Sequence, residues 1–178
     1  MLGESQSLRS TLLSRSMLRE GSLSSLPAKS LLTPRRLDLV VKWRFFLHLT
    51  SGDDPDSELV YRWHIEARSG ARMKAGLKTD RWKQSAEDYV QSAKMLHYSM
   101  SRGGFFDSYA IPIDQNGELL GGAHRLACAM ALGIDHVQVE RHTRLVWAPA
   151  WDEAWFVANG VSVPDLARIK ADWELMKQ

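Results

Sequence analysis

The sequence has few of the features that mark secreted, membrane-spanning or strongly nucleic-acid-binding proteins. Its single cysteine, Cys128, excludes an intrachain disulfide and an all-cysteine metal site, so a reducing cytoplasm is the simplest compartment. No stretch approaches the roughly 18 consecutive apolar residues that a membrane-spanning helix needs. The formal net charge is only +2, whereas nucleic-acid-binding proteins usually carry a strongly basic face. Small molecules and other proteins are therefore the expected partners.

The chain of 178 residues is long enough for one domain with a hydrophobic core. Residues 1–32 differ from the rest, because they are rich in serine, leucine and arginine and poor in acidic residues. A transit-type targeting peptide, a short amphipathic helix and a disordered extension all share this composition. We expect an accessory or disordered segment over 1–32 and a single domain over 33–178.

Two helices are predicted in the first part of that domain. Thr33-Pro34 has the form of an N-cap followed by proline at the first helical position, so a helix is expected to begin there. A second helix is expected from Asp56 or Ser57 to about Arg68, with Leu59 and Trp63 facing inward. The basic block 68–83 is predicted to be a long loop, either solvated or able to close over a polyanionic ligand.

The centre of the chain predicts the order helix, strand, hairpin, strand, helix, strand. Ser85 and Asp88 have the spacing of a capping box, and Asn116-Gly117 is a strong hairpin signal. Two short helices are expected over 150–177, where the tryptophans predict packing rather than base stacking. The fold class is therefore α/β (α+β), a small mixed sheet with packed helices. The expected segments are helix 85–103, strands 109–114 and 118–120, helix 123–132 and strand 136–140.

The turn Gly121-Gly122-Ala123-His124-Arg125 lies between a predicted strand and a predicted helix. Adjacent glycines allow positive φ and close approach of a ligand, and a helix N-terminus attracts anions. The imidazole and guanidinium add charge-assisted donors, so the turn is predicted to bind phosphate. The alternative is a turn in which the glycines only relieve crowding.

The run from Ile111-Pro112-Ile113-Asp114 through the hairpin to the Gly-x-His-Arg turn resembles the ParB/sulfiredoxin-like superfamily. The resemblance covers the core motif 85–142. It implies that a nucleotide, ATP or ADP, is bound through its phosphates, with Lys94 on the preceding helix also in contact. The segment 33–84 more loosely resembles the helical lead-in of bacterial members associated with polysaccharide biosynthesis. The cofactor-binding residues implied are Gly121, Gly122, Ala123, His124, Arg125 and Lys94.

The branches of this superfamily differ in chemistry. Sulfiredoxins carry a nucleophilic cysteine where this chain has Ala123. Cys128 lies five residues further along the predicted helix and on another face, so we expect it to be a small buried side chain. Partition-type ParB proteins add a helical DNA-binding domain, for which the stretch after residue 142 is expected to be too short. The free-serine kinases, which use a carboxylate as base, are the most similar branch.

This resemblance implies a cytoplasmic, nucleotide-binding phosphotransferase with nucleotide-linked Mg²⁺. Its acceptor would be a small hydroxyl-bearing molecule or a glycan precursor. The candidate catalytic residues are Glu66, Asp114 and His124, and no histidine or carboxylate spacing predicts a bound zinc. Two other functions remain open. One is a non-catalytic nucleotide-sensing or protein-interaction module, and the other is a ParB-like DNA-binding protein.

Overall fold

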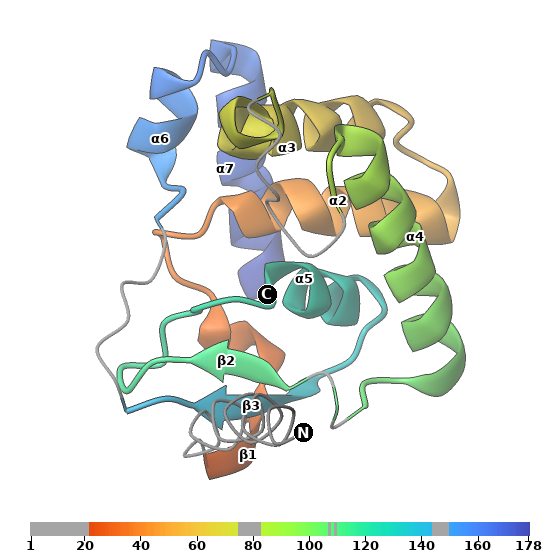
Figure 1. The fold of residues 1–178 in the computed structure, drawn as a ribbon, viewed down its shortest axis with the longest axis vertical. Helices are drawn as coiled ribbons and strands as arrows, with labels where there is room; N and C mark the ends of the chain where they lie inside the picture. The colour runs from red at the N-terminus through yellow and green to blue at the C-terminus, as the bar shows by residue number, and fades with distance from the viewer. Residues whose placement is uncertain (1–21, 75–82, 107, 109, 144–149) are drawn as a thin grey trace, which may run out of the picture.

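The computed structural model describes residues 22–74, 83–106, 108, 110–143 and 150–178. It consists of a small sheet covered by successive layers of helices (Figure 1). The prediction of an α+β fold with a small mixed sheet is confirmed. No helix in these ranges is long and apolar enough to cross a membrane.

The three strands form a mixed sheet with β3 in the centre. They are β1 (Ser22–Pro27), β2 (Ile111–Ile113) and β3 (His136–Arg141). β1 is antiparallel to β3, with Leu26 opposite Val137. β2 is parallel to β3, with Ile111 opposite Val139. The side chains of Ile111, Val137 and Val139 are buried, so the inner face of the sheet contributes to the core.

The helices stack on this sheet in an order that does not follow the chain. Figure 1 shows α5 directly above β2 and α3 near the top of the view. α2 contacts α5, α3, α4 and α7, and is therefore the central helix of the domain. The helices are α2 (Asp38–Ser51), α3 (Asp56–Lys74), α4 (Ala86–Gly103), α5 (Ala123–Ala131), α6 (Glu153–Ala158) and α7 (Val163–Lys177), with a 3-10 turn, η1, at Ala28–Leu31.

The N-terminal part of the fold begins earlier than the sequence predicts. Residues 22–31 form β1 and η1, and Ala28 and Leu31 are buried in the core. This differs from an accessory or disordered segment over 1–32, of which residues 1–21 lie outside the described ranges. The side chains of β1 are mostly exposed, so its order comes from backbone pairing with β3 and leaves no hydrophobic pattern in the sequence.

Two predicted helix boundaries are wrong. α2 begins at Asp38 rather than at Thr33-Pro34, because the intervening residues form a turn in which Arg36 bridges Trp151. α3 continues to Lys74, so the first part of the predicted basic loop 68–83 is helical, while residues 75–82 lie outside the described ranges. The inward face of α3 differs in part, since Trp63 packs against the core as predicted but Leu59 is exposed.

Several local signals are confirmed. The Ser85–Asp88 capping box is present at the start of α4, which ends at Gly103 with Gly104 as its C-cap. α7 lies within the predicted helical segment 150–177 and follows the N-cap Ser162, whose hydroxyl accepts a hydrogen bond from the backbone N–H of Asp165. The hairpin is shorter than predicted, because its returning side makes only an isolated bridge between Ile113 and Leu119 among the described residues.

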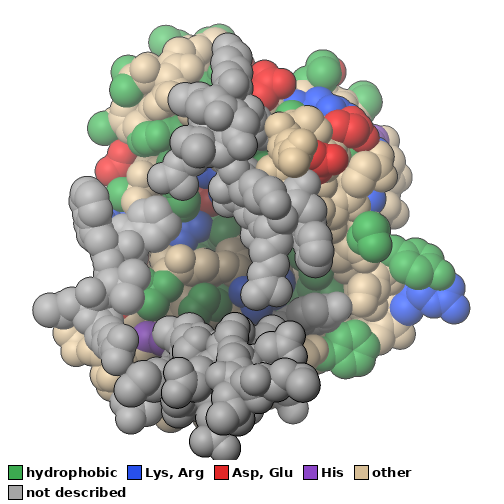
Figure 2. Space-filling view, viewed as in Figure 1, with side chains coloured by type: hydrophobic (Ala, Val, Ile, Leu, Met, Phe, Trp, Pro, Cys, Tyr) green, Lys and Arg blue, Asp and Glu red, His purple; other side chains and the backbone are tan. Residues whose placement is uncertain are grey.

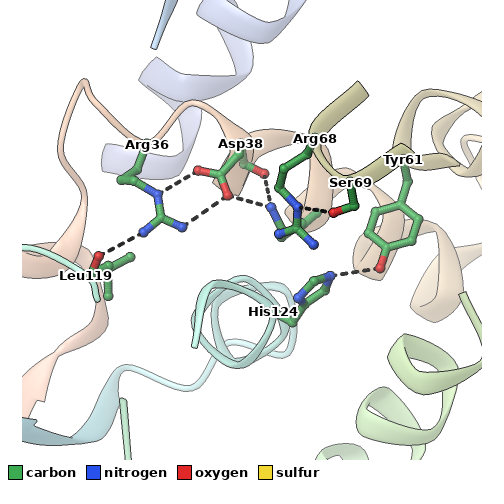
Figure 3. Close-up of polar contacts among 8 residues, drawn as sticks. Arg36, Asp38, Tyr61, Arg68, Ser69, Leu119 and His124 are labelled. Atoms are coloured by element: carbon green, nitrogen blue, oxygen red, sulfur yellow. Dashed lines mark hydrogen bonds and ion pairs between the residues drawn. The ribbon is translucent and has the colours of Figure 1, made fainter. Parts of the chain in front are cut away.

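A buried ion cluster joins α2 to the segment before α5. The Asp38 carboxylate accepts hydrogen bonds from Arg36 Nε at 2.8 Å, Arg36 Nη2 at 3.1 Å and Lys42 Nζ at 2.5 Å. Arg36 Nη1 also donates to the carbonyl oxygen of Leu119 at 3.2 Å (Figure 3). All three charged side chains are buried, so the cluster fixes the position of the chain shortly before Gly121.

The protonation states follow from this geometry. Burial opposes ionisation of Asp38, but the charges of Lys42 and Arg36 outweigh it and hold the pKa of the carboxyl well below its usual range. Burial lowers the pKa of Lys42 to about 7, although Asp38 favours the charged form. The carboxylate is therefore the anionic centre on which both cations depend.

We expect Asp38→Asn to lower the free energy of unfolding by about 3–5 kcal/mol, because it leaves two buried cations without a counter-charge. Urea unfolding followed by circular dichroism measures this change. Asp53→Asn, at an exposed aspartate, is the control and should change stability little. A loss of less than about 1 kcal/mol in Asp38→Asn, the range of an exposed ion pair, would contradict the structural role of the cluster.

Candidate functional site

The Gly-x-His-Arg turn forms the N-terminus of α5. Gly122 is the N-cap and has φ of +73°, in the left-handed region. A Cβ atom at this position would lie 3.1 Å from Arg125 Nη2 and 3.2 Å from Ile111 Cγ2. Glycine is therefore required both by the backbone conformation and by the close approach of β2 and the arginine.

A pocket of about 310 Å³ lies between α4 and the N-terminus of α5. It is lined by Lys83, Tyr89, Ser92, Ala93, Leu96, Gly122, His124 and Arg125. The lining combines cationic side chains with a hydroxyl and an apolar wall, and no described carboxylate lines it. The partial positive charge of the α5 N-terminus adds to these cations, so the pocket favours an anionic ligand.

His124 connects the pocket to the interior. Its Nε2 atom lies 2.8 Å from the Tyr61 hydroxyl and shares a hydrogen bond with it, as Figure 3 shows. Burial, together with the positive charges of Lys42 and Arg68, holds the pKa of His124 well below its ordinary value. Burial also raises the pKa of Tyr61 above its ordinary value. Both groups are therefore neutral at physiological pH, and Tyr61 fixes the orientation of the imidazole.

Arg125 lines the pocket and also supports the backbone. Its Nη1 atom donates a hydrogen bond to the carbonyl oxygen of Ala110 at 2.6 Å, next to the start of β2. Burial lowers the pKa of the guanidinium. Arg125 thus contributes positive charge to the pocket from a fixed position.

Two further cations are held on the Tyr89 ring. The Lys83 ammonium lies 4.7 Å from the ring centroid and the Arg68 guanidinium 5.4 Å from it. Cation–π contacts of this kind restrain long side chains that would otherwise sample many rotamers. Tyr89 therefore gathers positive charge beside His124, whose ring centroid is 6.4 Å from that of Tyr89.

The structure brings together only part of the predicted site. Gly122, His124 and Arg125 line the pocket, with Gly121 and Ala123 directly beside them in the turn. The side chain of Ala123 is buried. The prediction for Cys128 is confirmed, since it is buried and burial raises the pKa of its thiol to about 12.

The other predicted residues do not line this pocket. Glu66 is exposed on α3, because the inward face of that helix carries Tyr61 and His64 instead. Asp114 shapes the hairpin, where its Oδ1 atom accepts hydrogen bonds from two backbone N–H groups, each at 2.8 Å. Lys94 forms an ion pair with Glu58 at 3.1 Å. Neither predicted carboxylate is therefore placed to act as a base there.

The remaining residues around the pocket were not predicted as ligand-binding residues. Tyr89 and Leu96 follow the apolar spacing of α4, which predicts burial and says nothing of a ligand. Lys83 and Arg68 are the two ends of the basic block that was predicted to be a loop. Arg68 and Lys83 are far apart in the sequence, so their shared contact with the Tyr89 ring is seen only in the folded structure.

Neither a metal site among the described residues nor a similar known protein indicates what the pocket binds. In the described ranges, no group of three or more histidine, cysteine, aspartate or glutamate residues lies close enough to hold a metal ion. Comparison of the chain with family models, with curated proteins and with solved structures finds no match. The resemblance to the ParB/sulfiredoxin-like superfamily therefore stays a prediction.

The buried histidines predict a specific dependence of stability on pH. His64 and His124 have pKa values well below 6.5 in the folded protein, so below about pH 6.5 the unfolded chain binds more protons than the folded one. Their contribution to stability is complete above that pH and is lost as the pH falls. We expect the free energy of unfolding to decrease between about pH 6.5 and pH 5.

His64→Phe should make this decrease shallower, by at most about 1.4 kcal/mol per pH unit, because it removes one group that takes up a proton on unfolding. Urea unfolding at each pH gives the slope. His136→Phe is the matched control, since His136 is exposed, and it should retain the slope of the wild type. Parallel slopes for His64→Phe and wild type would show that His64 is not a buried neutral group.

Proposed function

We propose that this protein binds a nucleotide, ATP or ADP, with its phosphate groups at the N-terminus of α5. The observation that carries the proposal is the pocket in which Lys83, His124 and Arg125 meet that helix end and no described carboxylate is present. Phosphate oxygens accept hydrogen bonds both from cationic side chains and from the N–H groups of a first helical turn. The arrangement therefore favours a ligand with more than one negative charge.

The pocket also suits the uncharged part of a nucleotide. Ala93 and Leu96 form an apolar wall on α4, while Ser92 adds a hydroxyl group. A volume of about 310 Å³ lies at the lower end of the range for small-molecule sites. We propose that the phosphates lie against the cations and that the nucleoside extends along α4. Free nucleotides are abundant in the cytoplasm, the proposed compartment.

Binding without phosphoryl transfer is the form of the proposal that the geometry supports best. Transfer to a hydroxyl-bearing acceptor uses a carboxylate or a similar group to accept the proton of the attacking hydroxyl. Glu66 is exposed on another face of α3, and Asp114 is engaged by backbone N–H groups in the hairpin. We therefore favour a nucleotide-sensing or interaction module over the phosphotransferase and DNA-binding alternatives.

Lys83→Met should weaken ADP binding about tenfold, because it removes one charge-assisted contact while keeping an unbranched side chain on Tyr89. Isothermal titration calorimetry with ADP and with ATP measures the affinity. Lys94→Met is the matched control. Lys94 lies on α4 but pairs with Glu58 and does not line the pocket, so its removal should leave the affinity unchanged.

Two results would contradict the proposal. Failure of the wild type to bind either nucleotide would rule out the pocket as a nucleotide site, and equal weakening by both lysine variants would indicate non-specific attraction. A separate incubation with γ-labelled ATP, Mg²⁺ and panels of amino acids and sugars tests the absence of catalysis. Acceptor-dependent transfer of label would replace the binding module with a phosphotransferase.

A further inference from the structure

Arg68 on α3 projects into the interior without a carboxylate partner among the described residues. Figure 3 shows its side chain directed from α3 toward His124 and α5. The guanidinium lies between two aromatic rings, 5.4 Å from the centroid of Tyr89 and 5.6 Å from that of Trp151. Its one hydrogen bond to a described residue runs from Nε to Ser69 Oγ, at 3.3 Å. Most of its donors are therefore held in place by ring contacts rather than by acceptors.

Lys42 adds a second, fully buried cation near Arg68. The positive charge of Arg68 lies close enough to lower the pKa of Lys42, in addition to the larger effect of burial. Lys42 Nζ donates to Asp38 Oδ2 at 2.5 Å and to the Asp38 carbonyl oxygen at 3.3 Å. An ammonium group has three N–H donors, so these two bonds leave one more.

His64 is the third polar side chain of this region, and its ring nitrogens are the feature that the structure explains least. Its side chain is completely buried, and neither ring nitrogen has a hydrogen-bond partner among the described residues. The aromatic rings of Trp155 and Phe156 pack beside the imidazole, with their centroids 5.5 Å and 6.0 Å from that of His64. Buried polar atoms are nearly always hydrogen-bonded, so an imidazole with two unpaired nitrogens indicates a missing ligand.

The charge balance points to the sign of that ligand. Among the described residues, the buried Arg36 and Lys42 and the half-buried Arg68 place three cations around one carboxylate, that of Asp38. Burial and the nearby cations keep His64 neutral. Uncompensated charge in a protein interior is unfavourable by several kcal/mol. A dianion would offset the excess and accept the remaining hydrogen bonds. Figure 2 shows Lys and Arg side chains near the centre of this face of the molecule.

We propose that Lys42, His64 and Arg68 form an oxyanion site of the phosphate class, separate from the α4–α5 pocket. Arg68 would donate through its guanidinium, Lys42 through its remaining N–H, and His64 through its single ring N–H. This inference goes beyond the proposed nucleotide site and does not depend on it. Tyr89 connects the two regions, since its ring lines the pocket and also carries Arg68.

Inorganic phosphate titrated into the full-length protein tests this site directly. The ¹⁵N resonances of the His64 ring, assigned by comparison with His64→Phe, should shift and saturate, because one ring nitrogen gains an acceptor. Isothermal titration calorimetry on the same samples gives the affinity. Arg68→Met should weaken phosphate binding at least about tenfold, as expected for the loss of a charged hydrogen-bond donor.

Arg102→Met is the matched control, because the Arg102 guanidinium also lies 5.4 Å from a tyrosine ring, that of Tyr98, but on the exposed side of α4. It should bind phosphate as the wild type does. Circular dichroism and urea unfolding confirm that both variants fold. Unshifted His64 resonances at saturating phosphate overturn the proposal, as does equal phosphate affinity in Arg68→Met and wild type.

Titrations with AMP and ADP then show whether the bound oxyanion is free phosphate or part of a nucleotide. If the site takes free phosphate, AMP and phosphate bind together without competing, and Arg68→Met leaves ADP affinity unchanged. If it takes the second phosphate of a bound nucleotide, Arg68→Met weakens ADP but not AMP. If Lys83→Met loses ADP binding but keeps phosphate binding, the two sites are separate. The nucleotide proposal and the oxyanion proposal can then be contradicted independently.

Discussion

The Asp38 carboxylate joins Arg36 and Lys42 in a buried ion cluster at the start of the central helix α2. A buried carboxylate is favourable only when cations and hydrogen bonds replace its lost hydration, and here two cations do so from the start of α2. Arg36 extends the contact to the carbonyl oxygen of Leu119, close to Gly122. One anion thus joins the central helix to the strand end from which α5 begins.

Among the described residues, the buried cations Arg36 and Lys42 outnumber the one buried carboxylate, that of Asp38. Arg68 and Lys83 add positive charge on the ring of Tyr89, and His124 stays neutral beside them. Aromatic rings hold the Arg68 guanidinium without cancelling its charge, whereas a carboxylate would cancel it. The positive potential is therefore available to a ligand, and this is the common basis of the nucleotide and oxyanion proposals.

Features set by neighbouring residues were predictable from the sequence. The capping box at Ser85 and the glycine turn at Gly122 depend on local backbone geometry, and both are present where the sequence placed them. The inward face of α3 was not predictable, because its apolar residue Leu59 is exposed while the polar His64 is buried. That rotation depends on contacts with α5 and α6, which lie far away in sequence, since Tyr61 meets His124 and His64 packs on Phe156. It also removes Glu66 from the interior and brings Arg68 into it.

If phosphate binds at the first turn of α5, the backbone amides of that turn report the binding. In a ¹H–¹⁵N correlation experiment with added ADP, the N–H resonances of Ala123 and His124 should shift progressively and saturate with a single dissociation constant that matches calorimetry. Amide shifts confined to other parts of the chain, with those two resonances unmoved at saturation, would contradict phosphate binding at this turn.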